Sequence, residues 1–335
     1  MGLWPMSKVR LMGQRPMPRF HFIPNYTSVI FPPMQKIPKD VLYFEIGPDN
    51  PVTHRIQPGE TFEVQTQINN GPWIDRLPDE AEREMWRKKL RGGNPSSGCI
   101  HVEGAKAGDC LSIEIGAIEL DPVGYTSFGG NNSAMPGWLE IGSHSKIVDI
   151  RDGIIHWSDT LKLPARPMLG YVGVSPQRER FNNGWGGYWG GNMDAQEITT
   201  GTTLHLRVNT DGALLHVGDM HAIQGDGEIC GAGGIEAGGR VTLTCRLTSP
   251  APESLRYPRI ETAAHIGVVT NARPAEDAFR LALVDLLRWL QESYKIPYGE
   301  AYLLLGQVLE ARVSAFVNPT FSYVAKVGKQ YLPKL

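Results

Sequence analysis

Cysteine is scarce in this chain of 335 residues, which contains only Cys99, Cys110, Cys230 and Cys245. No two of them have the Cys-x-x-Cys spacing that is typical of a zinc ribbon or a thioredoxin-like redox motif. Four cysteines are also too few for a disulfide-stapled scaffold of this length. We therefore expect free thiols and a reducing compartment, the cytoplasm.

An excess of basic residues and long apolar runs are also missing. The chain has 33 Lys and Arg against 35 Asp and Glu, so it lacks the positive charge with which proteins neutralise nucleic-acid phosphates. No apolar run approaches the roughly 20 residues of a membrane span. Residues 1–19 are basic and rich in Pro and Met, without the apolar centre of a signal peptide. We expect neither a nucleic-acid partner nor a membrane partner.

Glycine and proline are abundant, with 38 and 25 residues, and this favours a turn-rich β protein. Several segments alternate between apolar and polar residues, as strands do: 41–46, 61–68, 203–208 and 240–247. Near the C-terminus, 275–294 and 299–313 have apolar residues at helical spacing. The predicted class is a β-dominated α+β fold, in which many short strands form a β-sandwich or barrel-like core and a C-terminal helical pair closes it.

We divide the chain into an extended N-terminal arm (1–40), a β-rich catalytic region (41–270) and a helical segment (271–335) that completes the same domain. Three local predictions accompany this division. They are a charged, solvated helix over 77–90, a hairpin-like unit over 100–115 that turns at Gly108-Asp109, and a long Gly- and Asn-rich loop over 121–139. No Gly-x-Gly-x-x-Gly follows a strand, so a dinucleotide-binding domain is not expected.

The stretch from Gly190 to Glu236 contains the densest set of possible ligands, acids and bases in the chain. A glycine pair precedes Asn192 and Asp194, and a later strand runs out into a glycine-framed series of polar residues. Glycine lets backbone turn tightly, so these side chains can converge. The polar residues after the strand are Asp219, His221, Gln224, Asp226, Glu228 and, beyond a Gly run, Glu236.

The spacing of these residues indicates a metal site. Asp219 and His221 are two residues apart, so both leave the same face if the strand continues through them. With Asp194 they would give the mixed oxygen and nitrogen ligands that suit a zinc-like divalent ion with an open position for water. Glu228 would then serve as the general base. Asp226 has the same spacing to Glu228 and is a further candidate.

Other interpretations remain open for the same residues. An Asp before a Gly commonly makes a turn, and a lone His is often a hydrogen-bonded core residue. Cys230 could be a thiolate nucleophile with His221 as its base, or a small buried residue. Trp185, Tyr188 and Trp189 could line a substrate mouth or pack their loop onto the sheet.

Four sequence blocks resemble the acetamidase/formamidase family of amide hydrolases. They are PGETFEVQTQ (58–67), NPSSGCIHVEGAKAGDCLSIEI (94–115), GGNMD (190–194) and GALLHVGDMHAIQGDGEICG (212–231). AYLLLGQVLEARV (301–313) also resembles the C-terminal helix of that family. The blocks follow in the same order over residues 41–335, and GDMHAIQGDGE is the most specific of them.

The resemblance implies hydrolysis of a short amide to a carboxylate and ammonia. It also implies a β-rich fold, a homo-oligomer and a bound divalent metal, zinc. The motif positions in this sequence are Asn192, Asp194, Asp219, His221, Gln224, Asp226, Glu228 and Glu236. Among them we expect Asp194, Asp219 and His221 to bind the metal, Glu228 to act as base, and Asn192 or Gln224 to donate to the developing oxyanion.

Departures from the family pattern affect the expected substrate. The segment 25–33 lacks the expected His- and Trp-containing motif, and Ala195-Gln196-Glu197 follows GGNMD in place of a Cys-Lys-Asp-like sequence. The loop before GGNMD is also richer in Trp and Tyr. A larger or more apolar amide, or a carbamate, would fit such a mouth. The two alternatives to this enzyme are a Cys230-dependent amidase and a non-enzymatic metal-binding β-sandwich.

Overall fold

The computed structural model describes residues 34–69, 81, 88, 94–129, 133–138 and 142–334. Residues 1–33 of the predicted arm, which include the segment 25–33, lie outside the described residues. The predicted helix over 77–90 also lies outside them, except for residues 81 and 88. Residues 35–37, which we assigned to the arm, form strand β1 (Gln35–Ile37) and pair in parallel with β5 (Thr61–Thr66) of the same chain. The arm prediction is therefore wrong for these residues, because the fully buried Ile37 belongs to the main core.

Strands are the main secondary structure of the described chain. The remaining strands of the first half are β2 (Leu42–Tyr43), β3 (Glu45–Ile46), β4 (His54–Ile56), β6 (Ser96–Val102), β7 (Cys110–Phe128), β8 (His144–Arg151), β9 (Ile154–His156), β10 (Lys162–Pro164) and β11 (Met168–Gly173). The second half has β12 (Phe181–Asn182), β13 (Gly186–Gly187), β14 (Gly190–Asn192), β15 (Thr203–Arg207), β16 (Leu215–His221), β17 (Ala232–Thr248), β18 (Arg259–Glu261), β19 (His265–Ala272), β20 (Glu310–Ala315) and β21 (Phe321–Gly328).

Apart from residues 81 and 88, the helical residues that the structure describes lie in short turns or near the C-terminal end. They are α2 (Ala275–Tyr294) and α3 (Tyr298–Val308), with two short 3-10 turns, η1 (Asp226–Glu228) and η2 (Lys329–Tyr331). Pro274 precedes α2 as predicted, and the predicted bounds of this helix agree with the structure. The β-dominated α+β class is confirmed.

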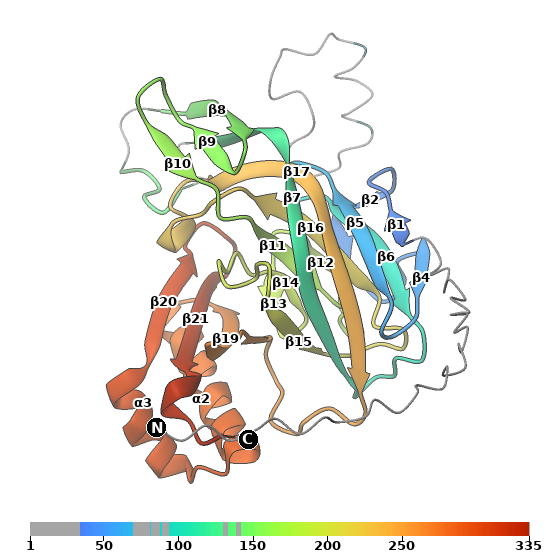
Figure 1. The fold of residues 1–335 in the computed structure, drawn as a ribbon, viewed down its shortest axis with the longest axis vertical. Helices are drawn as coiled ribbons and strands as arrows, with labels where there is room; N and C mark the ends of the chain where they lie inside the picture. The colour runs from blue at the N-terminus through green and yellow to red at the C-terminus, as the bar shows by residue number, and fades with distance from the viewer. Residues whose placement is uncertain are drawn as a thin grey trace, which may run out of the picture. The chain divides into compact units, whose positions relative to one another are not determined.

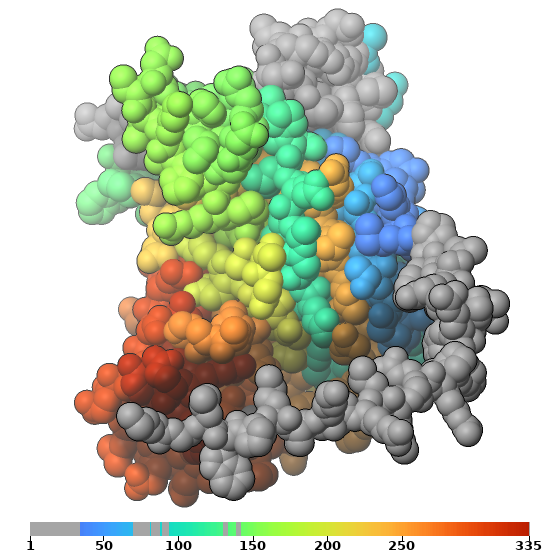
Figure 2. All heavy atoms as spheres, viewed as in Figure 1, coloured from blue at the N-terminus to red at the C-terminus, as the bar shows by residue number. Residues whose placement is uncertain are grey.

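The two longest strands, β7 and β17, run antiparallel beside each other (Figure 1). One half of this pair lies against β5 and β15, and the other half continues past them, where β7 pairs with β8. Side chains of the two strands lie next to each other on one face of the molecule in Figure 2. That face is polar: Arg246 Nε donates to Glu114 Oε1 at 2.6 Å, and Arg240 pairs with Glu119.

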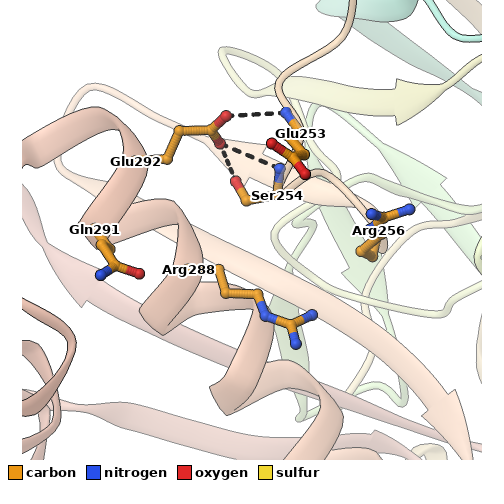
Figure 3. A pocket seen from close by; sticks show the side chains of 6 residues that line it. All are labelled: Glu253, Ser254, Arg256, Arg288, Gln291 and Glu292. Carbon is orange, nitrogen blue, oxygen red and sulfur yellow. Dashed lines mark hydrogen bonds between the residues drawn. The ribbon is translucent and has the colours of Figure 1, made fainter.

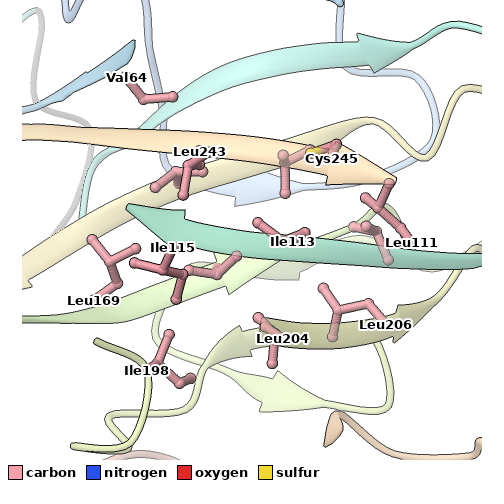
Figure 4. Close-up of a cluster of buried hydrophobic side chains, with 14 of the residues drawn as sticks. Val64, Leu111, Ile113, Ile115, Leu169, Ile198, Leu204, Leu206, Leu243 and Cys245 are labelled. Carbon is pink, nitrogen blue, oxygen red and sulfur yellow. The ribbon is translucent and has the colours of Figure 1, made fainter. Parts of the chain in front are cut away.

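The main core lies on the inner side of this sheet. Alternate residues of β7 and β17 face inward and meet side chains from β11 and β15, as Figure 4 shows. Val241, Leu243 and Cys245 are buried in this cluster, which confirms the predicted alternation and the role of Cys245 as a small core residue. Fully burying one Leu or Ile side chain contributes about 1.5–3 kcal/mol. This core supports the strands that carry the polar residues of the stretch from Gly190 to Glu236.

A second core forms near the C-terminus. Strand β18 pairs with β15 and β19, and β19 pairs with β21, so the sheet continues into this lobe. One side of it is covered by α2 and α3, whose Leu286, Leu290 and Leu305 are buried against β19 and β21. The C-terminal segment therefore contributes strands to the sheet in addition to the predicted pair of helices.

Three local predictions are wrong. Residues 121–128 of the predicted loop belong to β7, because pairing with both β8 and β17 satisfies their backbone despite the Pro and Gly content. The predicted hairpin over 100–115 does not form: β6 pairs with β2, β4 and β16, and β7 pairs elsewhere. The predicted helix 299–313 ends at Val308, and Glu310–Ala315 is strand β20 paired with β21.

Candidate metal centre

Five ionisable side chains converge at one buried place near the ends of β14, β16 and β17. Each is at most 4% exposed. They come from segments far apart in the fold: Asp194 follows β14, Asp219 and His221 end β16, Glu228 lies in η1, and Glu236 lies in β17. Strand β16 continues through His221, which was the condition for expecting Asp219 and His221 to leave the same face.

Strand pairing and small residues bring these side chains together. His221 stands opposite Glu236 in the register of β16 and β17, and His221 Nε2 lies 3.4 Å from Glu236 Oε2. Asp219 Oδ1 is 3.5 Å from the same nitrogen. A Cβ at Gly170 in β11 would come within 2.4 Å of Asp194 Oδ1 and 2.7 Å of Asp219 Oδ2. Glycine at position 170 therefore leaves the room that the two carboxylates occupy.

Backbone conformation at the centre is unusual. Asp194, Asp219 and Glu228 have φ of 43°, 53° and 44°, in the left-handed region that non-glycine residues seldom adopt. Such residues cost free energy and cluster at functional sites, where the surrounding structure enforces them. In each case the left-handed conformation belongs to a residue whose carboxylate faces the centre.

The facing atoms have unused lone pairs. Buried atoms without any hydrogen-bond partner include Asp194 Oδ1, Asp219 Oδ1, His221 Nε2, Glu228 Oε2 and Glu236 Oε2. They fall into two compact groups that share His221, one with Asp194 and Asp219 and the other with Glu228 and Glu236. Within each group the ligand atoms all lie within 4.8 Å of one another. Buried acceptors that face one another without donors are costly unless a cation joins them.

Gln224 determines which nitrogen of His221 faces the centre. The Gln224 Nε2 group donates to the carbonyls of Asp194, at 2.7 Å, and Ser314, at 3.0 Å. Its Oε1 must then be the acceptor at 2.8 Å from His221 Nδ1, so Nδ1 carries a hydrogen. This leaves the lone pair of the neutral ring on Nε2, which faces Asp219 and Glu236. Holding the distal ring nitrogen in this way is a usual second contact of metal-binding histidines.

Electrostatics at the centre favour a cation. Burial, followed by the charge of Asp219, raises the pKa of Asp194 to about 7. Burial and neighbouring carboxylates also raise the pKa of Asp219, and that of Glu228 well above its usual range. Burial lowers the pKa of His221, but the charges of Glu236 and Asp219 outweigh it and raise that pKa well above 6.5. Crowded carboxylates thus attract positive charge to this place, as protons or as a metal ion.

The donor set suits a divalent metal. Carboxylate oxygens and one imidazole nitrogen are ligands that zinc accepts, and the unpartnered atoms above supply more than the three protein ligands of a catalytic zinc site. The predicted ligands Asp194, Asp219 and His221 form one of the two compact groups. Glu236, a further candidate in the sequence, lies in the other group together with Glu228.

Two residues that the sequence analysis did not single out also contact the centre. Asn318, between β20 and β21, donates to Asp194 Oδ2, and Ser314 in β20 accepts from Gln224. They lie more than 100 residues after Asp194 and outside the GDMHAIQGDGE block. Spacing alone could not have found them, because only the pairing of β20 with β21 brings them to the centre.

Two other candidates lie apart from the five convergent side chains. Asp226 is exposed, and its carboxylate contacts Arg312 Nη1 at 3.3 Å and Gln196 Nε2 at 3.3 Å. Cys230 is half-buried, and burial raises the pKa of its thiol, which disfavours the thiolate. Neither residue belongs to the two compact ligand groups.

The aromatic loop before Asn192 has two parts. Trp189 is buried and stacks on Phe181 with ring centroids 3.9 Å apart, so it packs the loop onto its surroundings. Trp185 is 39% exposed, and its carbonyl accepts a 3.0 Å hydrogen bond from the Asn192 backbone. Of the three aromatic residues considered, Trp185 is thus connected directly to the segment that leads to Asp194.

A pocket of about 510 Å³ lies elsewhere, between α2 and the segment 253–256 (Figure 3). One of its lining carboxylates, Glu292, accepts from the backbone N–H of Glu253 at 2.9 Å and from Ser254. These bonds hold the segment onto the helix. The lining residues include no histidine or cysteine and none of the five convergent side chains.

Within the part of the chain that the structure describes, no helix is both long and apolar enough to cross a membrane.

Comparison with known proteins identifies the family. The model of the acetamidase/formamidase family matches residues 37–185 and 186–319. A Schizosaccharomyces pombe protein named as a formamidase is 25% identical over 259 residues, which are 60% of this chain and 62% of that relative. The chain thus spans less than two thirds of that relative.

Two solved structures are similar over nearly their whole length. The recombinant Thermoanaerobacter tengcongensis protein, named as a predicted acetamidase/formamidase, has 29% identity and a TM-score of 0.80, covering 89% of this chain and 96% of its own. The acetamidase of Bacillus halodurans has 29% identity and a TM-score of 0.79, covering 88% and 98%. Because the family model matches most of this chain, the chain belongs to the acetamidase/formamidase family.

Proposed function

We propose that this protein hydrolyses the carbon–nitrogen bond of a small amide, with a divalent metal held in the buried centre. One observation carries the proposal: five buried ligand atoms face one another without donors, and three of them, on Asp219, His221 and Glu228, belong to the GDMHAIQGDGE block. Family membership supports the same reaction class.

The residues would divide their roles as follows. Asp194, Asp219 and His221 would hold the metal, with Glu236 as an additional ligand. When bound, the metal would polarise the amide carbonyl and lower the pKa of a water molecule toward about 7. We propose zinc, because the donor set combines imidazole and carboxylate.

Glu228 would move the proton. Its buried Oε2 has no partner and lies in the same cluster as His221. The carboxylate would accept a proton from water as the water oxygen bonds to the amide carbon. It would return that proton to the leaving nitrogen as the carbon–nitrogen bond breaks, so that ammonia and a carboxylate are released.

Asn192 would bind the oxyanion. Between the two predicted donors, Gln224 already gives both amide hydrogens to backbone carbonyls and accepts from His221. Gln224 therefore serves to position His221, and the side chain of Asn192 is the one left to donate. Loss of such a donor typically slows turnover about 10²–10³-fold.

Several broader features are part of the same proposal. Residues 41–335 would act as one catalytic domain, since Asn318 and Ser314 of the C-terminal segment contact the centre. We also propose a homo-oligomer and a cytoplasmic location, in line with free cysteines. Exposed Trp185 beside Asn192 would favour an amide larger or more apolar than formamide.

The test is ammonia release from a panel of aliphatic and aromatic amides, with metal-replete and chelator-treated protein. We expect release that stops on chelation and returns with zinc. Glu228→Gln should lower kcat about 10²–10⁴-fold while the metal content stays at the wild-type level. Loss of metal in this variant would instead make Glu228 a ligand.

The alternatives give different results in the same assay. Release that survives demetallation and is blocked by iodoacetamide would transfer the chemistry to Cys230 and His221. Bound zinc without turnover of any amide would indicate a metal-binding protein that is not an amidase.

A further inference from the structure

Three asparagine side chains form a line that leads to Asn192. Asn69 Nδ2 lies 2.8 Å from Asn94 Oδ1, and Asn94 Nδ2 lies 3.1 Å from Asn192 Oδ1. They come from three different segments, which follow β5, precede β6 and lie within β14. All three are at least partly buried, and Asn192 is 1% exposed.

A backbone group determines the direction of this line. The backbone N–H of Asn94 can only donate, and it donates to Asn69 Oδ1 at 3.0 Å. The Nδ2 group of Asn69 must then face Asn94 Oδ1, and the Nδ2 group of Asn94 must face Asn192 Oδ1. Reversing any one amide would place two donors or two acceptors against each other. The amide of Asn192 is therefore oriented with its oxygen toward Asn94 and its NH₂ group away from it.

Asn94 itself is held at several points. Its carbonyl accepts from Asn183 Nδ2 at 2.9 Å, while its backbone N–H and side chain bind Asn69. Its φ of 51° lies in the left-handed region, which asparagine tolerates better than most residues. A side chain fixed this firmly can hold its neighbour in one orientation.

The line ends in β14, which pairs with β11, and β11 pairs with β16, the strand of Asp219 and His221. Asn192 stands opposite Tyr171 in β11, and Gly218 of β16 stands opposite Tyr171 on the other edge. A Cβ at Gly218 would come within 2.5 Å of the Pro95 carbonyl, so the segment after Asn94 packs directly on β16 beside Asp219. Asp194 follows Asn192 by two residues. Among the described residues, none accepts a hydrogen bond from Asn192 Nδ2.

We propose that Asn94, backed by Asn69, is a positioning residue that turns the NH₂ group of Asn192 toward the reacting carbonyl oxygen. This inference rests on the proposed amide hydrolysis, in which Asn192 binds the developing oxyanion. The three amides would thus fix the polarity of the donor before substrate arrives, and preorganised donors are the ones that stabilise a transition state best.

The first test is Asn94→Asp. Aspartate keeps the size, the left-handed backbone and the acceptor for Asn69, but it cannot donate to Asn192 Oδ1. Asn192 would then turn its NH₂ group toward the new carboxylate. We expect kcat to fall about 10–100-fold with little change in KM, because the lost interaction acts in the transition state. Metal content and thermal midpoint should stay near the wild-type values.

Three variants separate positioning from other effects. Asn94→Gly removes the amide without adding charge, suits the left-handed backbone and should lower kcat to a similar degree. Asn209→Asp makes the same chemical change at a half-buried site in another loop and should leave kcat unchanged. In an Asn192→Ala background, Asn94→Asp should cost nothing further, because the residue that it orients is gone. An equal additional loss in that background would overturn the proposal.

A measurement that does not need turnover tests the orientation itself. Neutron diffraction from deuterium-exchanged crystals of the wild-type protein should place the two Asn192 deuterons on the side away from Asn94. Deuterons that face Asn94 would refute the inference even if the protein is an amidase. If no amide is hydrolysed, the proposed function fails while the diffraction result still decides the orientation.

Discussion

Two buried groups of charges in this protein differ in how their lone pairs are used. At the metal centre, five ligand atoms of Asp194, Asp219, His221, Glu228 and Glu236 have no hydrogen-bond partner. Between α2 and β18, by contrast, Arg259 donates to Asp285 Oδ1 through Nε at 3.0 Å and Nη2 at 2.8 Å. Asp285 Oδ2 accepts from the backbone N–H groups of Arg256 and Tyr257, both at 3.1 Å.

This difference separates a site for chemistry from a site for structure. Every acceptor of Asp285 is used, and its partner Arg259 also donates to Ser254 Oγ and lies over the ring of Trp289. Such a pair needs nothing further and joins α2 to the chain before β18. The metal centre has an excess of carboxylates with no basic partner but one imidazole, so a ligand from outside the chain would complete it. Burial is similar in the two places and therefore does not distinguish them.

The largest expected effect comes from removing one charge at the centre. Asp219→Asn should abolish metal binding and with it measurable amide hydrolysis. In chelator, the same change should raise the free energy of unfolding by about 1 kcal/mol, because it relieves repulsion that the wild type retains for function. Metal content by mass spectrometry and urea unfolding in chelator measure the two effects.

Asp226→Asn is the matched control for that change. It lies in the same polar segment, but its carboxylate is exposed and contacts Arg312 outside the centre. Metal content and turnover should stay within about twofold of wild type, as for a surface substitution. Zinc retained by Asp219→Asn, or lost by Asp226→Asn, would show that the ligands are assigned incorrectly.

Much of the centre could be predicted from sequence because it is local. Asp219 and His221 are two residues apart on one strand, and the glycines that frame them predict tight turns. Asp226 and Glu228 show the limit of spacing: they have the same separation, but η1 buries Glu228 and exposes Asp226. A helical turn in place of a strand puts two such residues on different sides.

The long-range contacts could not be predicted in this way. Asn318 and Ser314 belong to the C-terminal segment, 271–335, that we expected to be helical, and Asn94 follows the segment of the predicted charged helix. Strand β20 was hidden because Leu305, Leu309 and Val313 are four residues apart, as on one face of a helix. Only pairing with β21 decides that Glu310–Ala315 is a strand, and such pairing does not show in local sequence.

Breaking the satisfied pair should produce the next largest effect, on stability alone. Asp285→Asn leaves the buried Arg259 charge uncompensated, which typically costs about 3–5 kcal/mol of unfolding free energy. Metal content and turnover at low temperature should remain. The double variant Arg259→Met/Asp285→Asn should recover part of the loss, because no lone buried charge remains. Urea unfolding of the two variants and the wild type measures this, and a loss below about 1 kcal/mol in Asp285→Asn would contradict a structural role.

The smallest expected effect concerns the ion pair between Glu261 and Lys329 in the C-terminal lobe, and how its contribution to stability depends on pH. Glu261 accepts from Lys329 Nζ at 2.7 Å and lies 3.4 Å from His205 Nε2. His205, with Lys329, lowers the pKa of the Glu261 carboxyl to about 2 against the opposing effect of burial. A carboxyl whose folded pKa is lowered stabilises the fold above its unfolded pKa near 4.5, and this stabilisation is lost as pH falls toward about 2.

Glu261→Gln should therefore lower the free energy of unfolding at pH 7 by about 1 kcal/mol, a value reduced for solvent screening because the side chain is 40% exposed. The difference from wild type should shrink steadily below pH 4.5, where the wild-type carboxyl also becomes protonated. Asp159→Asn at an exposed bend should show no such convergence. Urea unfolding of all three proteins between pH 7 and pH 3 tests this. A difference that stays constant over this range would mean that Glu261 stabilises the fold through packing and not through its charge. Unpaired charge would then be a property of the metal centre, in contrast both to the paired charge of Asp285 and to Glu261.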